Sequence, residues 1–333
     1  MTFKFPERVS LATLPTPIVR LERLSKAWAA DVWIKRDDLT GAALSGNKIR
    51  KLEFELAEAV ARKAKAVITC GALQSNHARA TAIAARQLGL EPHLLLRTPD
   101  GKAPAEWDGN ALLDRLVGAE IRYVTPDQYR NERAAIMAEM AEKLRAANKP
   151  AFVIPEGASD ARGALGYVQA MREIVEQSRE MGVSFAYVAH ACGSGGTSAG
   201  LAMGNAIYDA GIFPVAFAVC DDESYFKNVV GGIVSDFAKT FGGISDPSQA
   251  KLSIIDRHKG IGYGQSTAEE LAFIREVATM EGILLDPVYS GKAMFGVRQE
   301  LQSGKTFRRG APILFLHTGG MFGLFPKRFE FAF

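Results

Sequence analysis

The chain has 333 residues, of which 47% are hydrophobic and 23% are charged. This composition is ordinary for a globular protein and excludes a disordered, collagenous or coiled-coil chain. Lysine and arginine number 40 and aspartate and glutamate 37, which gives a net charge of +3. The two signs are interspersed and form no basic stripe, so the sequence does not indicate a nucleic-acid partner. At roughly 100–200 residues per domain, the length predicts about two domains.

The cysteines and the N-terminus indicate a cellular location. Cys70, Cys192 and Cys220 lie far apart and form no CxxC pair, so neither a disulfide framework nor a zinc site is expected. The N-terminus lacks the apolar stretch of a signal peptide, and no apolar run approaches the ~20 residues of a membrane span. The five histidines have no metal-ligand spacing. We therefore expect a cytoplasmic protein without a membrane partner or a metal.

The predicted elements alternate between strands and helices after an irregular start. The first 45 residues are expected to be irregular, apart from a short strand at 32–35. Further strands are predicted at 65–70, 93–97, 120–124, 151–155, 185–192, 214–220, 283–285 and 312–318. Helices are predicted at 48–63, 75–90, 109–118, 127–148, 161–182, from 197, from about 224, and at 266–282 and 291–302. Short apolar strands that alternate with helices predict parallel sheets covered on both faces.

A glycine-rich turn follows the predicted strand at 185–192 and opens the next helix. Its residues are Gly193, Ser194, Gly195, Gly196 and Thr197. Glycines let the backbone approach a ligand closely, and N–H groups at a helix N-terminus bind anions. The turn has the spacing of neither a Walker motif nor a dinucleotide fingerprint. It therefore predicts a phosphate site of another kind, with a flexible turn capped by Thr197 as the alternative.

Several other polar residues follow predicted strands or open helices, where ligands of α/β sheets bind. Each of these residues also has an ordinary structural interpretation, such as a helix cap or a surface lysine. They are Lys48 after a Gly-Asn turn, the helix start Ser75-Asn76-His77, Tyr263 between two glycines, and Tyr289, Ser290 and Thr318 in late turns.

These motifs together resemble a known family, the pyridoxal-phosphate enzymes of the tryptophan-synthase β-like group (fold type II). The similarity is greatest to the branch of D-cysteine desulfhydrase and 1-aminocyclopropane-1-carboxylate (ACC) deaminase. GNKIRKLE and QSNHARATA are specific to this branch. The motifs run in family order from residue 14 to 320 and are LPTPIVRLERLS, WIKRDDLTGAALSGNKIRKLEF, CGALQSNHARATA, PEGASDARGALGYV, GSGGTSAG, LLDPVYSGKAM and LFLHTGG.

The resemblance implies a fold of two three-layer α/β domains with mainly parallel, twisted sheets. The smaller domain, residues 51–160, would be inserted into the larger one, residues 1–50 and 161–333. Pyridoxal phosphate would lie in the cleft between them, and the family is commonly homodimeric, so we expect a homodimer here.

The resemblance also implies a role for each candidate residue. Lys48 would form the Schiff base with the cofactor, and Asn76 would bond the phenolic oxygen of the cofactor. Residues Gly193 to Thr197 would hold the phosphate. The substrate would meet Ser75, Asn76, His77, Tyr263 and Tyr289, of which Ser75 and the tyrosines would take part in catalysis together with Lys48. Either Ser290 or Thr318 would face the pyridine nitrogen.

The implied reaction is β-elimination from a small amino acid, and D-cysteine would yield pyruvate, ammonia and sulfide. ACC deaminases carry glutamate in the VY-x-GK motif where this chain has Ser290, a neutral residue that favours the desulfhydrase. L-cysteate sulfo-lyases share the GNK and SNHAR patterns, and Arg79 could meet their sulfonate. ACC deaminase and a catalytically silent binder are further alternatives. Ala158 stands where relatives often have glycine, so the sequence does not fix the exact backbone path of that turn.

Overall fold

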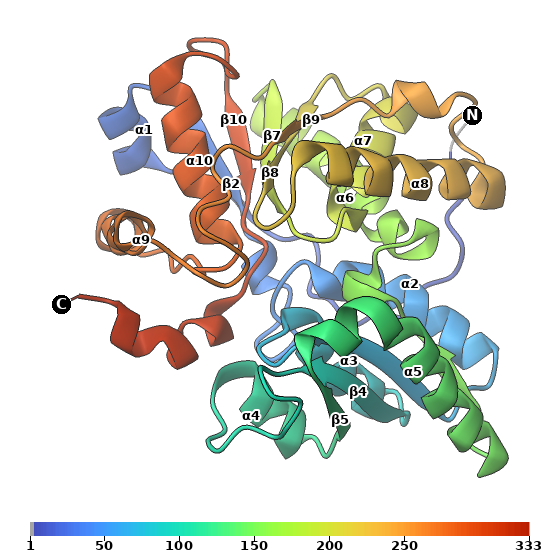
Figure 1. The fold of residues 1–333 in the computed structure, drawn as a ribbon. Coiled ribbons are helices and arrows are strands. Elements are labelled where there is room, and N and C mark those ends of the chain that lie inside the picture. Colours follow the sequence, from blue (N-terminus) through green and yellow to red (C-terminus); the bar gives the residue numbers. More distant parts are fainter. Residues whose placement is uncertain (1–2, 333) are drawn as a thin grey trace.

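The computed structural model describes residues 3–332, which form two separate sheets (Figure 1). The larger sheet has six strands in the order β1-β2-β10-β7-β8-β9. Every neighbouring pair is parallel except β1 and β2, which are antiparallel. The strands are β1 (Ile18–Arg20), β2 (Val32–Lys35), β7 (Tyr187–Cys192), β8 (Phe213–Ala218), β9 (Ser253–Ile255) and β10 (Ile313–Leu316).

The smaller sheet has four parallel strands in the order β5-β4-β3-β6. They are β3 (Ala66–Ala72), β4 (Glu91–Arg97), β5 (Glu120–Val124) and β6 (Ala151–Val153). All four lie between the chain segments that build the larger sheet. This arrangement agrees with two α/β units, whereas the exact boundaries at 50 and 160 stay a prediction.

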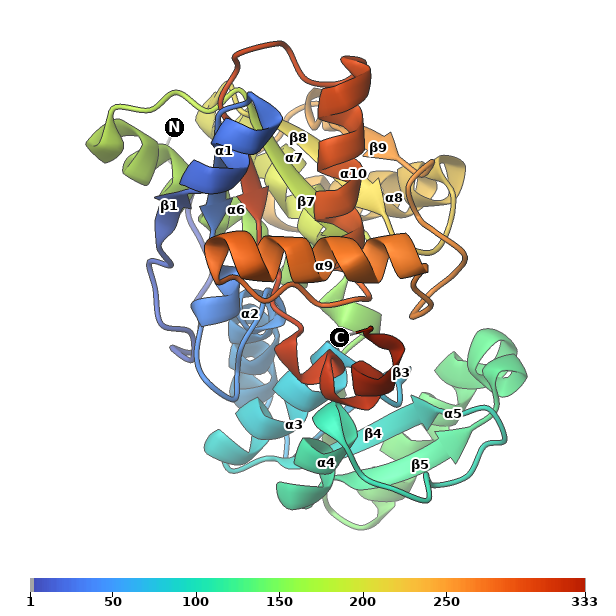
Figure 2. The same ribbon diagram turned by 90° about the vertical axis from the view of Figure 1, so that its left-hand side faces the viewer.

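Helices cover both faces of the larger sheet, because the side chains on both faces of its strands are apolar. One face packs against α1 (Glu22–Trp28), α9 (Ala268–Glu281) and α10 (Ser290–Ser303). Figure 2 shows α9 and α10 on this side. The other face packs against α6 (Ala161–Met181) and α7 (Gly196–Tyr208). Helix α8 (Glu223–Phe241) packs against these two helices and, through Phe226, against β8 and β9.

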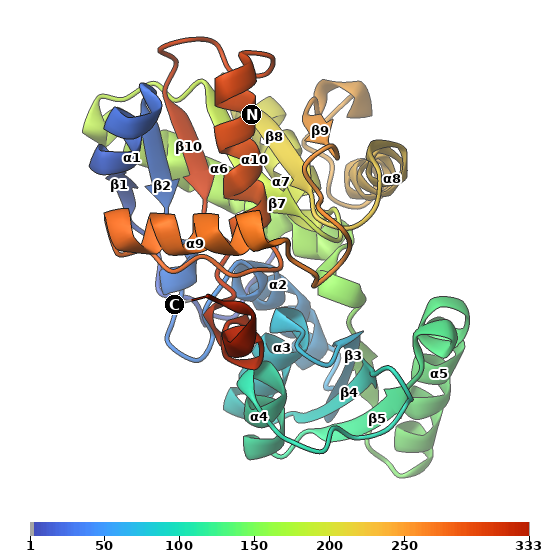
Figure 3. The same cartoon turned by 60° about the vertical axis from the view of Figure 1, so that its left-hand side comes forward.

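The smaller sheet is covered in the same way. On one face lie α2 (Lys48–Ala61), α3 (Asn76–Gln87) and α4 (Gly109–Leu116), and on the other lies α5 (Pro126–Ala146) (Figure 3). Helix α2 also packs against α6 of the larger unit. A Cβ atom at Gly166 in α6 would lie 2.5 Å from the Arg50 carbonyl oxygen, so only glycine allows these helices to lie this close.

Three segments differ from the sequence prediction. The region expected to be irregular contains β1 and α1, which are only 3 and 7 residues long and therefore give little periodic signal. Strand β9 was not predicted and is also 3 residues long. The strand predicted at 283–285 is wrong, because this segment joins no ladder. Its Leu284 carbonyl instead accepts a hydrogen bond from His317 Nε2 at 3.0 Å.

The hydropathy of the helices agrees with this packing. Within residues 3–332, none of the helices is both long and apolar enough to cross a membrane.

Candidate active site

A cavity of about 710 Å³ lies between the two sheets, and residues from both form its wall. This volume falls in the range of small-molecule sites. Eleven of the thirteen candidate residues line the cavity, and they come from six separate stretches of the chain. They are Lys48, Ser75, Asn76, His77, Gly193, Ser194, Gly195, Thr197, Tyr263, Tyr289 and Thr318.

Lys48 is the first residue of α2, and its amine lies in the cavity. Burial lowers the pKa of Lys48 to about 8, despite the charges of Glu156 and Asp286 that favour protonation. The preceding turn is fixed from two sides. The Asn47 side-chain amide donates to Thr197 Oγ1 at 3.1 Å, and the Asn47 backbone N–H donates to the backbone carbonyl oxygen of Thr318 at 3.1 Å.

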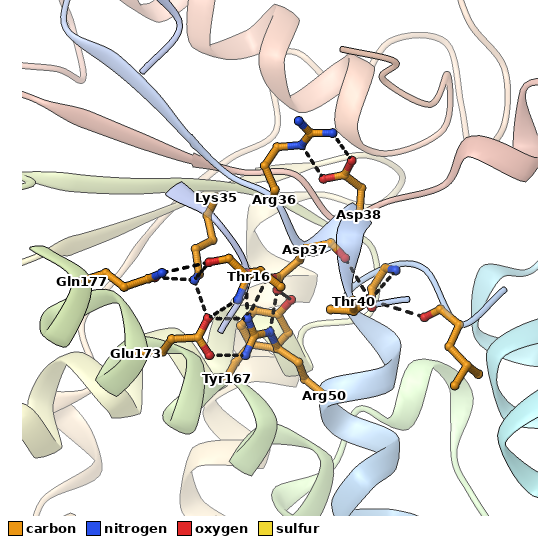
Figure 4. A network of polar contacts seen from close by, with 12 residues as sticks. Thr16, Lys35, Arg36, Asp37, Asp38, Thr40, Arg50, Tyr167, Glu173 and Gln177 are labelled. Atoms are coloured by element: carbon orange, nitrogen blue, oxygen red, sulfur yellow. Dashed lines mark hydrogen bonds and ion pairs between the residues drawn. The ribbon is translucent and has the colours of Figure 1, made fainter. Parts of the chain in front are cut away.

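A buried ion network fastens the first turn of α2 (Figure 4). The Arg50 guanidinium donates to both Asp37 oxygens at 2.8 Å and to Glu173 at 2.9 and 3.0 Å. Lys35 donates to the same Glu173 carboxylate at 2.5 Å. Two cations thus balance two carboxylates, and β2, α2 and α6 are tied together beside Lys48.

The glycine-rich turn lies at the N-terminus of α7, directly beside a buried lysine. Gly195 has φ of 82°, which favours glycine. A Cβ atom at Gly196 would lie 2.6 Å from Lys51 Nζ, so a side chain here would displace the amine. Lys51 is fully buried, and among residues 3–332 it donates to the Gly157 carbonyl oxygen at 3.0 Å and to Ser159 Oγ at 3.2 Å.

The N-terminus of α3 forms the wall of the cavity on the side of the smaller sheet. Ser75 caps the helix by accepting the Ala78 N–H at 3.1 Å, which leaves its hydroxyl hydrogen free. Asn76 Oδ1 accepts from Asn110 at 2.9 Å. His77 is buried, its Nε2 contacts Thr69 Oγ1 at 2.8 Å, and its Nδ1 has no partner among the described residues. Burial drives the pKa of His77 well below its ordinary value.

Two tyrosines from different loops meet in the cavity. The hydroxyl oxygens of Tyr263 and Tyr289 lie 2.5 Å apart. Burial raises the pKa of both phenols, so both are protonated at neutral pH. The loop of Tyr263 is held by buried Lys292 of α10, which donates to the carbonyl oxygens of Lys259 at 2.9 Å and Gly262 at 2.7 Å.

Two candidate residues do not line the cavity. Gly196 belongs to the glycine-rich turn, but its backbone N–H donates to Ser159 Oγ at 3.3 Å. Ser290 is fully buried, and its hydroxyl donates to Asp286 Oδ1 at 2.6 Å and accepts from the Asp286 N–H at 2.8 Å. The suggestion that Ser290 faces a pyridine nitrogen is therefore not supported, whereas its alternative, Thr318, does line the cavity.

The residues fit pyridoxal phosphate at both of its ends. Within the described part of the chain, the buried amine of Lys51 has no ion pair. It lies next to a glycine turn at a helix N-terminus, and such a site suits a phosphate. Lys48 offers an amine of lowered pKa to an aldehyde. Among residues 3–332, no group of three or more histidine, cysteine or acidic side chains could hold a metal ion.

Three residues near the cavity were missed or misread from the sequence. Lys51 was not singled out in the sequence, although its i, i+3 spacing from Lys48 places both on one helix face. Ser159 lines the cavity and bonds Ser194 Oγ at 2.8 Å. Arg79 was considered as a sulfonate partner. It is instead buried and bonded to Ser45, Asn110 and Ala43, so its guanidinium is already used.

Comparison with known proteins agrees with this geometry. Residues 9–319 match the family described as pyridoxal-phosphate dependent enzyme. The chain is 43% identical over 325 residues to the mitochondrial bifunctional D-cysteine desulfhydrase/ACC deaminase of Arabidopsis thaliana, covering 96% of this chain and 79% of that protein. It is 41% identical over 326 residues to the D-cysteine desulfhydrase of Yersinia pestis, covering 97% and 96%.

A solved structure is also similar to this chain. The crystal structure of an ACC deaminase homologue superposes with a TM-score of 0.86 at 40% identity, covering 97% of this chain and 95% of the other. The chain therefore belongs to the pyridoxal-phosphate dependent enzymes. It is an enzyme of fold type II in the group that contains D-cysteine desulfhydrases and ACC deaminases, and its cofactor is pyridoxal phosphate.

The pKa of Lys48 predicts how cofactor uptake depends on pH. Only a neutral amine attacks an aldehyde, and Lys48 becomes neutral as the pH rises through about 8. We expect the rate at which cofactor-free protein takes up pyridoxal phosphate to rise with pH, with a midpoint at about 8. Stopped-flow absorbance measures this rate. A midpoint near 10.5, the ordinary value for lysine, would contradict the assignment.

Proposed function

We propose that the protein is a β-eliminating lyase that converts D-cysteine and water into pyruvate, ammonia and hydrogen sulfide. The observation that carries this proposal is the neutral wall around Thr318. Thr318 offers a hydroxyl, and the Ser290 hydroxyl is bonded to Asp286. The Asp286 carboxylate accepts hydrogen bonds from the backbone N–H groups of residues 288–290 as well as from Ser290 Oγ, and it does not line the cavity.

A neutral wall favours a substrate with a good leaving group. Bound pyridoxal phosphate withdraws electrons from the α-carbon of an amino acid. A hydroxyl beside the pyridine nitrogen gives little reason for that nitrogen to be protonated, which makes this withdrawal weaker than beside a carboxylate. Thiolate departs readily even with this weaker electron withdrawal, whereas opening the carbon ring of ACC requires stronger withdrawal.

The side chains of the cavity can supply the required proton transfers. The Lys48 amine, with its pKa of about 8, can take up the α-proton near neutral pH. In the pair formed by Tyr263 and Tyr289, one hydroxyl donates to the other. The accepting hydroxyl keeps its own hydrogen and can donate it to the departing sulfur. The N-terminus of α3, with Ser75 and His77, suits the substrate carboxylate.

The test is a comparison of substrates on the purified, cofactor-loaded enzyme. D-cysteine, L-cysteine, L-cysteate and ACC are assayed side by side for oxo-acid, sulfide and sulfite. We expect D-cysteine to be turned over well above the others, with one sulfide released per pyruvate.

Each other outcome has a definite meaning. Sulfite from L-cysteate would keep the elimination chemistry and replace the substrate. 2-Oxobutyrate from ACC at a rate equal to that with D-cysteine would show that the neutral wall around Thr318 does not select against ring opening. The homodimer stays a prediction, which the mass of the enzyme in solution would test.

A further inference from the structure

Arg97 is a cation in the cavity that the proposed reaction does not yet use. It is the last residue of β4, so its side chain leaves the carboxyl end of the smaller sheet and lines the cavity. Its guanidinium lies 5.2 Å from the ring centroids of both Tyr129 and Tyr263. At this range a guanidinium is attracted to an aromatic face. Arg97 is therefore held between an α5 residue of the smaller unit and the loop of the tyrosine pair.

The charge of Arg97 is not compensated by the protein. Within residues 3–332 its guanidinium has neither an ion pair nor a hydrogen bond, so five N–H donors remain for a ligand. Glu156, a carboxylate that lines the same cavity, is paired with Arg133 at 3.2 Å. A cation that two rings hold in place without an anion is prepared to bind one, because little conformational freedom is lost on binding.

The other walls of the cavity indicate which part of a substrate reaches Arg97. The α-carbon of an amino acid carries an amino group, a carboxylate and a side chain. In the proposed reaction the amino group lies toward Lys48 and the carboxylate toward the N-terminus of α3. The side chain is left to point toward Tyr263, whose ring Arg97 covers.

We propose that Arg97 is the binding subsite for the β-substituent, and that it stabilises negative charge there, whether the substituent brings that charge or develops it as it leaves. The proposal rests on the proposed function, because that function places the amino group and the carboxylate. A planar guanidinium can give two parallel hydrogen bonds to a carboxylate or another oxyanion. With D-cysteine, the same group would stabilise the sulfur as it takes the electron pair of the Cβ–S bond.

Aspartate and asparagine test this subsite, because they have nearly the same shape and differ by one charge on the β-substituent. Equilibrium dialysis of the cofactor-loaded enzyme gives a dissociation constant for each, using the enantiomer that binds more tightly. We expect aspartate to bind about 10- to 100-fold more tightly than asparagine, the range of a charge-assisted hydrogen-bond pair. Arg97→Met should abolish this preference and leave the affinity for asparagine nearly unchanged.

Two further variants make the test specific. Arg97→Lys keeps the charge but not the fork of donors, so part of the preference should remain. Arg122→Met removes one positive charge from β5 outside the cavity, where Arg122 pairs with Glu139. It should leave the preference intact. If Arg122→Met lost the preference for aspartate to the same extent as Arg97→Met, the preference would come from the net charge of the smaller unit and not from a subsite. That result would overturn the proposal.

The remaining outcomes separate this proposal from the proposed function. Equal weakening of aspartate and asparagine by Arg97→Met would place Arg97 at the α-carboxylate and overturn the subsite. So would a wild-type enzyme that does not prefer aspartate, even if it turns over D-cysteine. If D-cysteine is not turned over but the aspartate preference depends on Arg97, the subsite stands and the proposed reaction falls.

Discussion

Lys48→Ala is expected to lower turnover of D-cysteine by at least about 10⁴-fold, which is the upper range for loss of a proton-transfer group. The variant loses both the amine that would hold the cofactor and the base that would take the α-proton. The amine of Lys51, three residues away, should not replace it, because it is engaged by Gly157 and Ser159. The absorbance band of bound cofactor should be lost together with turnover.

The same substitution should not destabilise the cofactor-free protein. Burial lowers the pKa of Lys48 from 10.5 to about 8, so the fold opposes protonation of this amine at neutral pH. One pKa unit corresponds to about 1.4 kcal/mol, and removal of the amine should therefore return about 1–3 kcal/mol, with packing of the lysine stem lost in exchange. A site residue that costs stability is typical of function rather than folding.

Thermal or urea unfolding of the cofactor-free protein measures this effect, with Lys65→Ala as the control. Lys65 is exposed and should leave both turnover and stability near the wild type. Substantial turnover in Lys48→Ala would remove Lys48 from its assigned role. Loss of turnover together with marked destabilisation would mean that the lysine is part of the fold, and that its absence disrupts the site indirectly.

Most of the helices and strands could be predicted from the sequence, since long periodic segments such as α2 and α6 carry their own signal. The short elements could not, because β1, α1 and β9 depend on partners far along the chain. The glycine turn and the start of α3 were recognisable as a site, since Gly195 and Ser75 belong to local patterns.

Features that depend on distant contacts were not visible in the sequence. The Tyr263–Tyr289 contact joins residues 26 positions apart, and Arg97 belongs to no motif. Ser290 was one of two candidates for the pyridine nitrogen, and the sequence did not show that its hydroxyl donates to Asp286 four residues earlier, a local arrangement that competes with a role at the cofactor. No role was predicted for Asp37 or Arg50 from the sequence, yet both are buried.

Asp37→Asn is expected to destabilise the protein by about 3–5 kcal/mol, the cost of removing one partner from a buried ion pair. Burial alone would raise the pKa of Asp37, but the Arg50 guanidinium outweighs it and keeps the pKa below its ordinary value. The carboxylate also accepts from Tyr167 at 2.6 Å and Thr16 at 2.8 Å (Figure 4). Without its charge, Arg50 would keep only Glu173 as a charged partner, and Lys35 shares that carboxylate.

Urea unfolding measures this loss, and the neighbouring Asp38 supplies the control. Asp38 pairs with Arg36 at 2.6 Å, and both side chains are partly exposed. Asp38→Asn should therefore cost less than about 1 kcal/mol. If Asp37→Asn does not fold, Tyr167→Phe removes a single hydrogen bond from the same carboxylate and should cost about 1–2 kcal/mol.

The network should also influence the site, because Arg50 lies two residues after Lys48 in the first turn of α2. Loosening of that turn would move the Lys48 amine relative to the glycine turn, so we expect Tyr167→Phe to slow cofactor uptake while Asp38→Asn does not. Equal effects of Asp37→Asn and Asp38→Asn on stability would mean that burial adds nothing to this pair. An unchanged uptake rate in a destabilised Tyr167→Phe variant would confine the network to folding.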